Sequence, residues 1–350
     1  MLLDARCLAL LAVLPLPGCG TLYLAQAAAG QWHVMAARRP IGAVVSDPST
    51  PPVLRTRLEE VRAARDFASR ALALPDNASY RAYAALDRDY VAWNVVAAPE
   101  FSVVPRTWCF PIAGCVAYRG YFSERRARAY ALTLESRGYD VAVGGVAAYS
   151  TLGRFADPVL STMLVYGDAQ IAAVIFHELA HQVVYVAGDS AFNEAFAVTV
   201  EQEGLARWLE TRGEPAVLAA WRRRRAVQAQ AAALFAARRE ELRRLYASPR
   251  APQAMRDAKR AVMRALAADL RTLEADSGVP SGHGRRIDAG LDNADIASVA
   301  TYFGCVPGFE RVLAGVDHDL PRFYAAVEAL AAQPAAARRA AVCAGASAAE

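Results

Sequence analysis

The chain has 350 residues, of which 55% are apolar, so it is long enough for one large domain or two ordinary ones with a substantial core. Its net charge is +4 and its isoelectric point is about 8.8, and this mildly basic balance argues against a dedicated nucleic-acid binder. All basic residues except Lys259 and the histidines are arginines, in an alanine-rich chain, so clusters of arginine carry little functional weight.

The first twenty residues, MLLDARCLALLAVLPLPGCG, predict an export signal. Arg6 precedes an apolar run over residues 7–16, which is too short to span a bilayer because a spanning helix needs about 20 apolar residues. The LPGC that ends at Cys19 resembles the lipobox of bacterial lipoproteins, in which the cysteine is lipidated and becomes the mature N-terminus. An uncleaved anchor and an ordinary signal peptide are the alternatives. We therefore predict a signal peptide over residues 1–18, a lipid anchor at Cys19 and a membrane-attached protein of the cell envelope that faces the periplasm. Gly20, where an Asp would indicate retention in the inner membrane, favours the outer membrane.

The rest of the N-terminal half predicts helices around a few strands. Apolar residues at helical spacing, with capping residues at the ends, predict helices over residues 22–37, 53–73, 123–138 and 168–187, and a further helix start near Ser79. β-branched and aromatic residues between prolines and glycines predict short strands within residues 89–121 and another over residues 139–153. This order of elements is typical of the α+β class, with a small sheet beside helices.

The C-terminal part predicts mainly helix. Residues 216–276 have the pattern of two long helices broken at ASPRAP, with charged residues on one side and Ala and Leu on the other. A solvated helical hairpin is the simpler interpretation, and a surface for anionic lipid or a partner is the alternative.

The stretch AAVIFHELAHQVVYV, residues 172–186, carries two histidines and a glutamate on an apolar helix. His177 and His181 are one helical turn apart and face the same way, so both can bind one metal ion. Glu178 is offset by about 100° and can reach a water on the metal without binding the metal itself. This is the logic of the HExxH zinc peptidases: zinc lowers the pKa of its water toward about 7, and the glutamate accepts the proton as general base. A hydrogen-bonded pair of core histidines is the alternative.

A catalytic zinc needs a third protein ligand and an open position. The candidates are Glu194, Glu201 and Glu203, in a helix that is predicted to begin at residue 189 or 190 after a short turn. Helix geometry alone leaves Glu194 and Glu201 both open. Asn193 and Glu194 resemble the third-ligand motif of the glutamate-type zincins, in which Asn precedes the ligating Glu. This resemblance favours Glu194, and it makes Glu201 a surface or supporting residue.

The cysteines fit an exported protein. Cys109 and Cys115 lie six apart with Pro and Gly between them, and export favours a disulfide that closes this small loop. Cys305 and Cys343 are also available for pairing.

The chain resembles the bacterial predicted zinc-dependent aminopeptidases of zincin type in several separate segments: LYLAQAAAGQ, WCFPIAGCVAYRGYF, YSTLGRFADPVLSTML, FHELAHQ, FNEAFA and YFGCVPGFERVL. The resemblance implies a zincin-like fold, mostly helical with a small sheet and an active-site HExxH helix. It implies one zinc ion at His177, His181 and Glu194, with Glu178 as the base. It further implies a zincin-like metallopeptidase core over residues 19–215, and a helical region over residues 216–350 packed on the same domain.

Two further expectations concern the substrate. Zincins lay an edge strand beside an extended peptide, and the strand that begins at Tyr139 would suit this role. Tyr149 or Tyr302 is a candidate for donating a hydroxyl to the oxyanion, although a packed or surface tyrosine is the simpler interpretation of each.

The leading hypothesis is an exported, lipid-anchored zinc metallopeptidase that acts on peptides, and the resemblance makes it an aminopeptidase. We expect it to bind a membrane through its anchor and to bind no nucleic acid. A non-catalytic envelope lipoprotein that keeps a zincin-like scaffold for binding is the alternative, and a zinc hydrolase of non-peptide amides is a third. Intact His177, Glu178 and His181 favour an enzyme.

Overall fold

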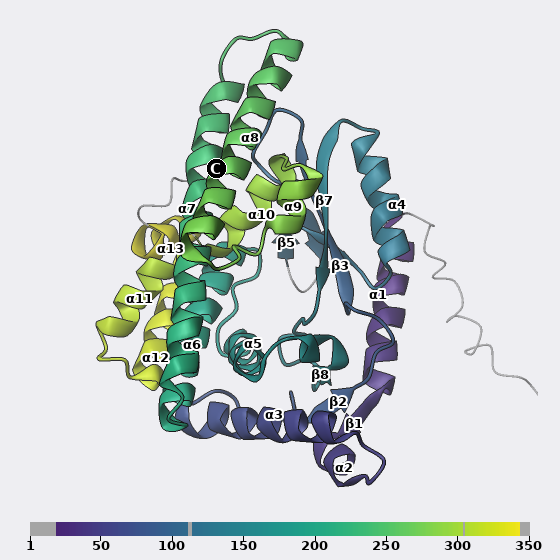
Figure 1. Ribbon diagram of the computed structural model, residues 1–350, viewed down its shortest axis with the longest axis vertical. Helices are drawn as coiled ribbons and strands as arrows, with labels where there is room; N and C mark the ends of the chain where they lie inside the picture. The colour runs from purple at the N-terminus through teal and green to yellow at the C-terminus, as the bar shows by residue number, and fades with distance from the viewer. Residues whose placement is uncertain (1–18, 111–113, 304, 344–350) are drawn as a thin grey trace, which may run out of the picture.

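The computed structural model describes residues 19–110, 114–303 and 305–343, with the backbone alone for residues 19–22 and 300–303 (Figure 1). The predicted signal peptide, residues 1–18, lies outside the described residues, as does the side chain of Cys19. Helices outweigh strands in the described part of the chain, which agrees with the α+β class. No helix there has the length and apolar character needed to cross a membrane.

The helices cover most of the chain, and one 3-10 helix lies over Ser161–Val165. The α-helices are α1 (Cys19–Ala36), α2 (Ile41–Ser46), α3 (Pro52–Ala71), α4 (Glu124–Glu135), α5 (Asp168–Ala180), α6 (Ser190–Thr211), α7 (Pro215–Tyr246), α8 (Pro252–Ser277), α9 (Gly284–Ala289), α10 (Asn293–Phe303), α11 (Val306–Ala314), α12 (Leu320–Ala331) and α13 (Ala335–Val342).

The strands form small sheets. The main one has the order β6-β3-β7, all antiparallel, with β3 (Ala92–Pro99) between β6 (Arg119–Tyr121) and β7 (Tyr139–Val146). A second sheet has the order β1-β2-β8 and joins β1 (Arg38–Pro40), β2 (Ala82–Ala84) and β8 (Val159–Leu160). The hairpin of β4 (Trp108–Phe110) and β5 (Gly114–Val116) carries a Cys109–Cys115 disulfide, as predicted. A second disulfide joins Cys305 to Cys343.

The core explains why α5 lies at the centre of the molecule. Its apolar residues Ile175, Phe176 and Leu179 are fully buried, and they belong to one cluster with Phe196 of α6 and Leu58 of α3. Helix α5 is therefore enclosed by α3 and α6, as Figure 1 shows. A helix that is apolar on nearly all sides is stable only in such surroundings.

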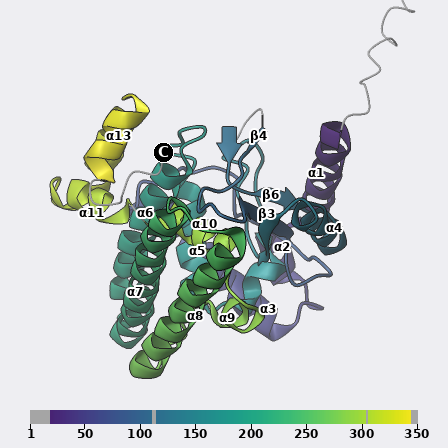
Figure 2. The same ribbon diagram turned by 90° about the horizontal axis from the view of Figure 1, so that it is seen from above.

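The helical hairpin α7–α8 forms a separate layer. The two helices run side by side in both views (Figures 1 and 2) and enclose a second cluster that includes Phe235, Leu266 and Leu270. Helices α1 and α4 lie on the far side of the molecule from α11 and α13 (Figure 2). The predicted hairpin over residues 216–276 thus corresponds to α7 and α8.

Three local predictions are wrong. The strand predicted over residues 139–153 ends at Val146. No helix starts near Ser79: the chain turns there, Tyr80 takes a left-handed conformation with φ 62°, and β2 follows. Helix α5 ends at Ala180, and not near residue 187, because the amides of Gln182 and Val183 bond to carbonyls three residues back and tighten the last turn.

Candidate metal centre

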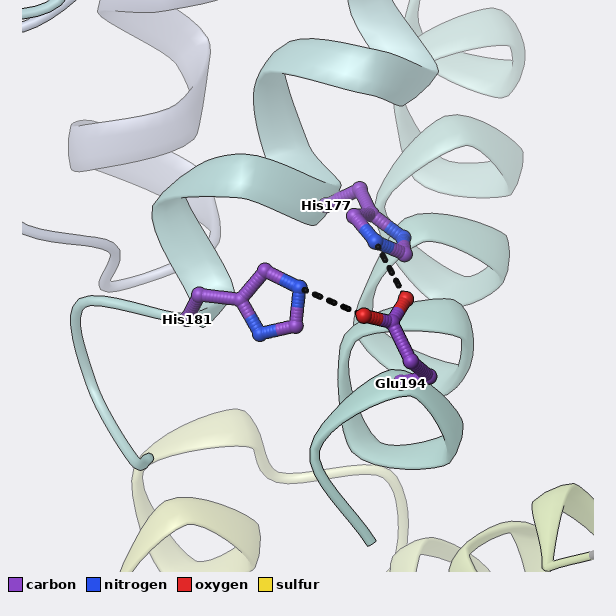
Figure 3. A group of neighbouring side chains, drawn as sticks. All are labelled: His177, His181 and Glu194. Carbon is purple, nitrogen blue, oxygen red and sulfur yellow. Dashed lines mark ion pairs between the residues drawn. The ribbon is translucent and has the colours of Figure 1, made fainter. Parts of the chain in front are cut away.

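The two histidines of the HExxH stretch meet a glutamate of the next helix. His177 lies in the last turn of α5, and His181 caps that helix. Nε2 of His177 is 3.4 Å from Oε2 of Glu194 in α6, and Nε2 of His181 is 3.9 Å from Oε1 of the same carboxylate. Figure 3 shows the two rings and the carboxylate pointing at one another. One ligand atom from each residue fits within 4.8 Å of the others, so the group can hold a metal ion.

Asn193 explains how Glu194 comes to face the histidines. Its side chain accepts a hydrogen bond from the amide of Val186 and donates one to the carbonyl of the same residue, both at 2.8 Å. Asp189 also caps α6, since its carboxylate accepts from the amide of Phe192. The turn between α5 and α6 is therefore clamped onto the start of α6. This clamp gives a physical reason for an Asn directly before Glu194.

The close approach of α6 to α5 depends on Gly204. A Cβ at this position would lie 2.7 Å from the side chain of Leu72 and 3.0 Å from the ring of Phe176. A larger residue would have to displace the side chain of Leu72 or Phe176, so the glycine allows the backbone of α6 to lie close to α5 here.

The other two candidate glutamates have different surroundings. Nδ1 of His177 donates a hydrogen bond to Oε2 of Glu201 at 3.1 Å, and Glu201 is buried. Glu203 binds Arg207 and His318 and takes no part in the group. Glu201 therefore contacts the ring atom of His177 that faces away from Glu194.

Glu178 has no hydrogen bond or ion pair with any described residue, although it is half-buried. Burial raises the pKa of Glu178 to about 7, and the nearby charge of Glu194 adds to this, while His177 opposes it. An unpaired carboxylate with a pKa near neutrality can accept and release a proton at physiological pH.

The two histidines differ in their electrostatics. Burial alone would lower the pKa of His177, but the contacts with Glu194 and Glu201 outweigh burial and raise that pKa well above its usual value. Burial, together with His177, lowers the pKa of His181 to about 4. For Glu194, burial is outweighed by His177, so its pKa is lowered.

No arginine or lysine balances the carboxylates of the group. No described Arg or Lys forms an ion pair with Glu178, Glu194 or Glu201. Even with His177 protonated, the carboxylates of Glu194 and Glu201 and the partly ionised Glu178 leave an excess of negative charge in a buried place, which is costly without a further cation. The donor set of two imidazole nitrogens and one carboxylate oxygen is also the set that zinc takes in one class of catalytic site. The residues present therefore fit a divalent cation.

The disulfide hairpin borders the group from another side. A Cβ on Gly114, which has φ 73°, would lie 2.6 Å from the amide nitrogen of Gly188, so β5 packs directly on the turn after α5. Tyr118 follows this hairpin; its ring is 36% exposed. Burial raises its pKa, and the charges of Glu194 and Glu178 add to this shift.

Tyr118 was missed in the sequence because no spacing links it to the HExxH stretch. Of the two candidate tyrosines, Tyr149 donates its hydroxyl to Gln31, in agreement with the simpler interpretation of a packed side chain, and the side chain of Tyr302 lies outside the described residues. The disulfide loop between Cys109 and Cys115 was the one signal near Tyr118.

A family model described as "Putative aminopeptidase" matches residues 22–342. The chain belongs to this family. The match spans nearly the whole described chain and includes α5, α6 and the hairpin α7–α8. Neither the curated proteins nor the solved structures gave a significant match. Membership of an aminopeptidase family marks the chain as a peptidase, and hence a hydrolase.

Proposed function

We propose that the protein is a zinc-dependent aminopeptidase with a zincin-like arrangement of its active site. His177, His181 and Glu194 hold one zinc ion, and Glu178 is the general base. The observation that carries the proposal is the convergence of three ligand atoms within 4.8 Å, from α5 and α6, beside a carboxylate with no partner. When bound, zinc supplies a Lewis acid that makes water a nucleophile near neutral pH and polarises the carbonyl of the substrate.

Glu178 moves the proton. Its carboxylate has no partner among the described residues, and its pKa is raised to about 7 by burial. It accepts a proton from the attacking water and passes it to the amine that leaves when the peptide bond breaks. A carboxylate that was already paired with an arginine could not exchange this proton so readily.

Glu201 positions a ligand. By accepting from Nδ1 of His177, it fixes the ring so that Nε2 turns toward Glu194 and His181. A carboxylate behind a ligating histidine orients the ring and makes it a better ligand. Its role is therefore to support the metal and not to bind it.

Tyr118 stabilises the oxyanion. It follows the hairpin that is closed by the Cys109–Cys115 disulfide and packs on the turn after α5, and the charges of Glu194 and Glu178 help to raise its pKa. A neutral hydroxyl, kept protonated by a raised pKa, can donate a hydrogen bond to the negative oxygen that develops on the substrate.

The protein works in the cell envelope, in this proposal. The lipobox-like LPGC supports lipidation of Cys19 and attachment to a membrane, with the protein on the periplasmic side and the outer membrane favoured. The substrates are peptides. The alternative, a non-catalytic lipoprotein that keeps this scaffold for binding, predicts a protein with no turnover on any peptide.

Metal analysis and a paired substrate screen test the proposal. The purified mature protein should contain about one zinc per chain. An aminopeptidase should cleave aminoacyl-fluorophores with a free N-terminus and leave their N-acetylated counterparts intact. Cleavage of internally quenched, N-acetylated peptides would instead indicate an endopeptidase. A protein that lacks zinc after purification without chelators, and gains no activity when zinc is added, would overturn the proposal.

A further inference from the structure

Helix α1 is fixed to the body of the protein by its inner face. The side-chain Nε2 of Gln26 donates a hydrogen bond to the carbonyl of Gly120, and its Oε1 accepts one from the backbone N–H of Phe122. A Cβ on Gly30 would lie 2.1 Å from the ring of Phe122, so helix and body are in the closest possible contact. The ring of Tyr23 stacks on Phe110 at 5.4 Å. The outward face of α1 therefore has one fixed orientation.

The outward face of α1 is apolar along its whole described length. None of the 18 residues of α1 is Asp, Glu, Lys or Arg. The side chains of Leu24 and Trp32 are 52% and 75% exposed. The exposed apolar residues, which we name the α1 face, follow the spacing of one side of a helix: Leu24, Ala25, Ala28, Ala29, Trp32 and Ala36. His33 lies at one edge of this face and is exposed.

Other long helices of the molecule have a different outer surface. The exposed side of α8 carries charged residues at intervals: Asp257, Arg260, Arg264, Arg271 and Asp276. A charged outer face is what water favours on a surface helix. An uncharged outer face that includes a tryptophan marks an interaction surface.

We propose that the α1 face lies along the surface of the lipid bilayer that holds the anchor at Cys19. This inference rests on the proposed lipidation and is independent of the peptidase activity. Cys19 is the first residue of α1, so an acyl chain on it brings the helix to the bilayer. Leucine and alanine can enter the boundary between headgroups and acyl chains, and tryptophan is favoured there because its ring is apolar and its N–H is polar.

The orientation of α1 relative to the membrane distinguishes this arrangement from one in which only the acyl chain contacts the bilayer. Trp32 follows Cys19 by thirteen residues, which is about 20 Å along a helix. If α1 stood upright on the membrane, Trp32 would be far above the headgroups. If α1 lies along the surface, Trp32 contacts lipid. The position of Trp32 therefore decides between the two.

Depth-dependent quenching of Trp32 tests the inference. The other four tryptophans, Trp93, Trp108, Trp208 and Trp221, are at most 9% exposed, so the difference between wild type and Trp32→Phe isolates one ring. The full chain is reconstituted in phosphatidylethanolamine and phosphatidylglycerol vesicles that contain lipids brominated near the headgroup. We expect a blue-shifted, quenched signal. Emission as in water, without quenching, would overturn the inference.

A second experiment removes the anchor and measures what the α1 face contributes alone. In the Cys19→Ala background, Trp32→Glu should lower the partition into the same vesicles by roughly 10- to 100-fold, the value of burying one large apolar side chain. Val53→Glu is the matched control, since Val53 is 73% exposed on another helix, and it should change nothing. Equal partition of the Trp32→Glu variant and its parent, or no partition of the parent, would overturn the inference.

These experiments would also detect the case in which a second copy of the chain, and not lipid, covers the α1 face. If the α1 face joined two copies, the protein would form a concentration-dependent dimer in detergent, and Trp32→Glu would abolish it while the lipid experiments stayed negative. Peptidase activity and zinc content should not change in any of these variants, so a failure here is separate from a failure of the proposed function.

The inner face of α1 connects this surface to the borders of the metal centre. Tyr23 stacks on Phe110 of the disulfide hairpin, which packs on the turn after α5. Gln31 accepts the hydroxyl of Tyr149, in the loop after β7. A bilayer on the outer side of α1 would thus be one helix away from the segments that border the active site.

Discussion

Two groups of ionisable side chains make an informative comparison: one between α5 and α6, and one between α8 and the sheet β6-β3-β7, which we name the α8 group. At the second place, Lys259 donates to the carboxylate of Asp140 and to the carbonyl of Glu100. Arg256 binds the carboxylate of Glu100 through two hydrogen bonds. Asn293 donates to Asp140 and to the carbonyls of two residues, and accepts from a tyrosine. Here each charge has its counter-charge.

The group between α5 and α6 is different. Three carboxylates face two imidazoles with no arginine or lysine, Glu178 has no partner, and the buried Nδ1 of His181 has no hydrogen bond with any described residue. Folding alone selects paired groups, because an unpaired buried polar group costs free energy. We therefore expect the α8 group to stabilise the fold, whereas the unpaired groups between α5 and α6 agree with the proposed zinc site. The following variants test this contrast, from the largest expected effect on turnover to the smallest.

Removal of a ligand should have the largest effect. In Glu194→Ala, and in His181→Ala, zinc content and turnover should fall together, because the site loses one of its three donors. Glu203→Ala is the matched control on the same helix: its carboxylate binds Arg207 and His318, so zinc should remain. The measurement is zinc content by mass spectrometry beside turnover. Full zinc retention in Glu194→Ala would contradict the assignment of Glu194.

Removal of the base should separate chemistry from metal binding. Glu178→Gln keeps the shape of the side chain but removes the basic oxygen, so turnover should fall by roughly 10²–10⁴-fold while zinc content stays near wild type. The same two measurements decide the outcome. Unchanged turnover would eliminate Glu178 as the base, whatever the metal content, and the contrast between the two groups would then lose its meaning.

Tyr118→Phe removes one hydroxyl near Glu194 and Glu178. If this hydroxyl stabilises the oxyanion, turnover should fall by roughly 10²–10³-fold with little change in KM, since the interaction is made in the transition state. Tyr149→Phe is the control, because the hydroxyl of Tyr149 is already bonded to Gln31. An equal loss in both variants would indicate a structural effect instead.

Glu201→Ala should weaken zinc binding without removing it. Glu201 contacts Nδ1 of His177, and loss of such a supporting carboxylate costs about 10–100-fold in metal affinity. With excess zinc in the assay, turnover should recover most of its value, which a lost ligand would not allow. Competition with a chelator of known affinity gives the measurement. If Glu201→Ala removes the metal entirely, and Glu194→Ala does not, then Glu201 is the third ligand.

The sequence predicted the parts of the site that depend on local spacing. His177 and His181 share a face because they are four apart on a helix, and the Asn before Glu194 indicated the side chain that the structure brings to them. Spacing could not predict that Glu201 would reach the far side of His177, because this depends on the packing of α6 against α5 at Gly204.

Long-range contacts explain what else could not be predicted. The hairpin before Tyr118 packs on Gly188, more than 70 residues further along the chain, and Lys259 meets Asp140 across 119 residues of chain. In each case the deciding partner is distant in sequence, so no local pattern encodes it.

The α8 group should affect stability and leave turnover unchanged. Lys259→Met and Asp140→Asn each break a pair whose side chains are 12% and 17% exposed. Each should lower the free energy of unfolding by about 2 kcal/mol, between the values for exposed and for fully buried pairs. The double variant should lose less than the sum of the two, because both single changes remove the same interaction.

Arg260→Gln gives the matched control for that loss. Arg260 pairs with Asp257 at the surface, where both side chains are more than half exposed. The free energy of unfolding of this variant should differ from that of the wild type by less than about 1 kcal/mol. Urea denaturation measures the stabilities, and zinc content and turnover are measured well below the unfolding midpoint. If Lys259→Met or Asp140→Asn lost turnover while still folded and loaded with zinc, the α8 group would serve the reaction as well. The contrast with the candidate metal centre would then be wrong, because it assumes that the paired charges of the α8 group take no part in the reaction.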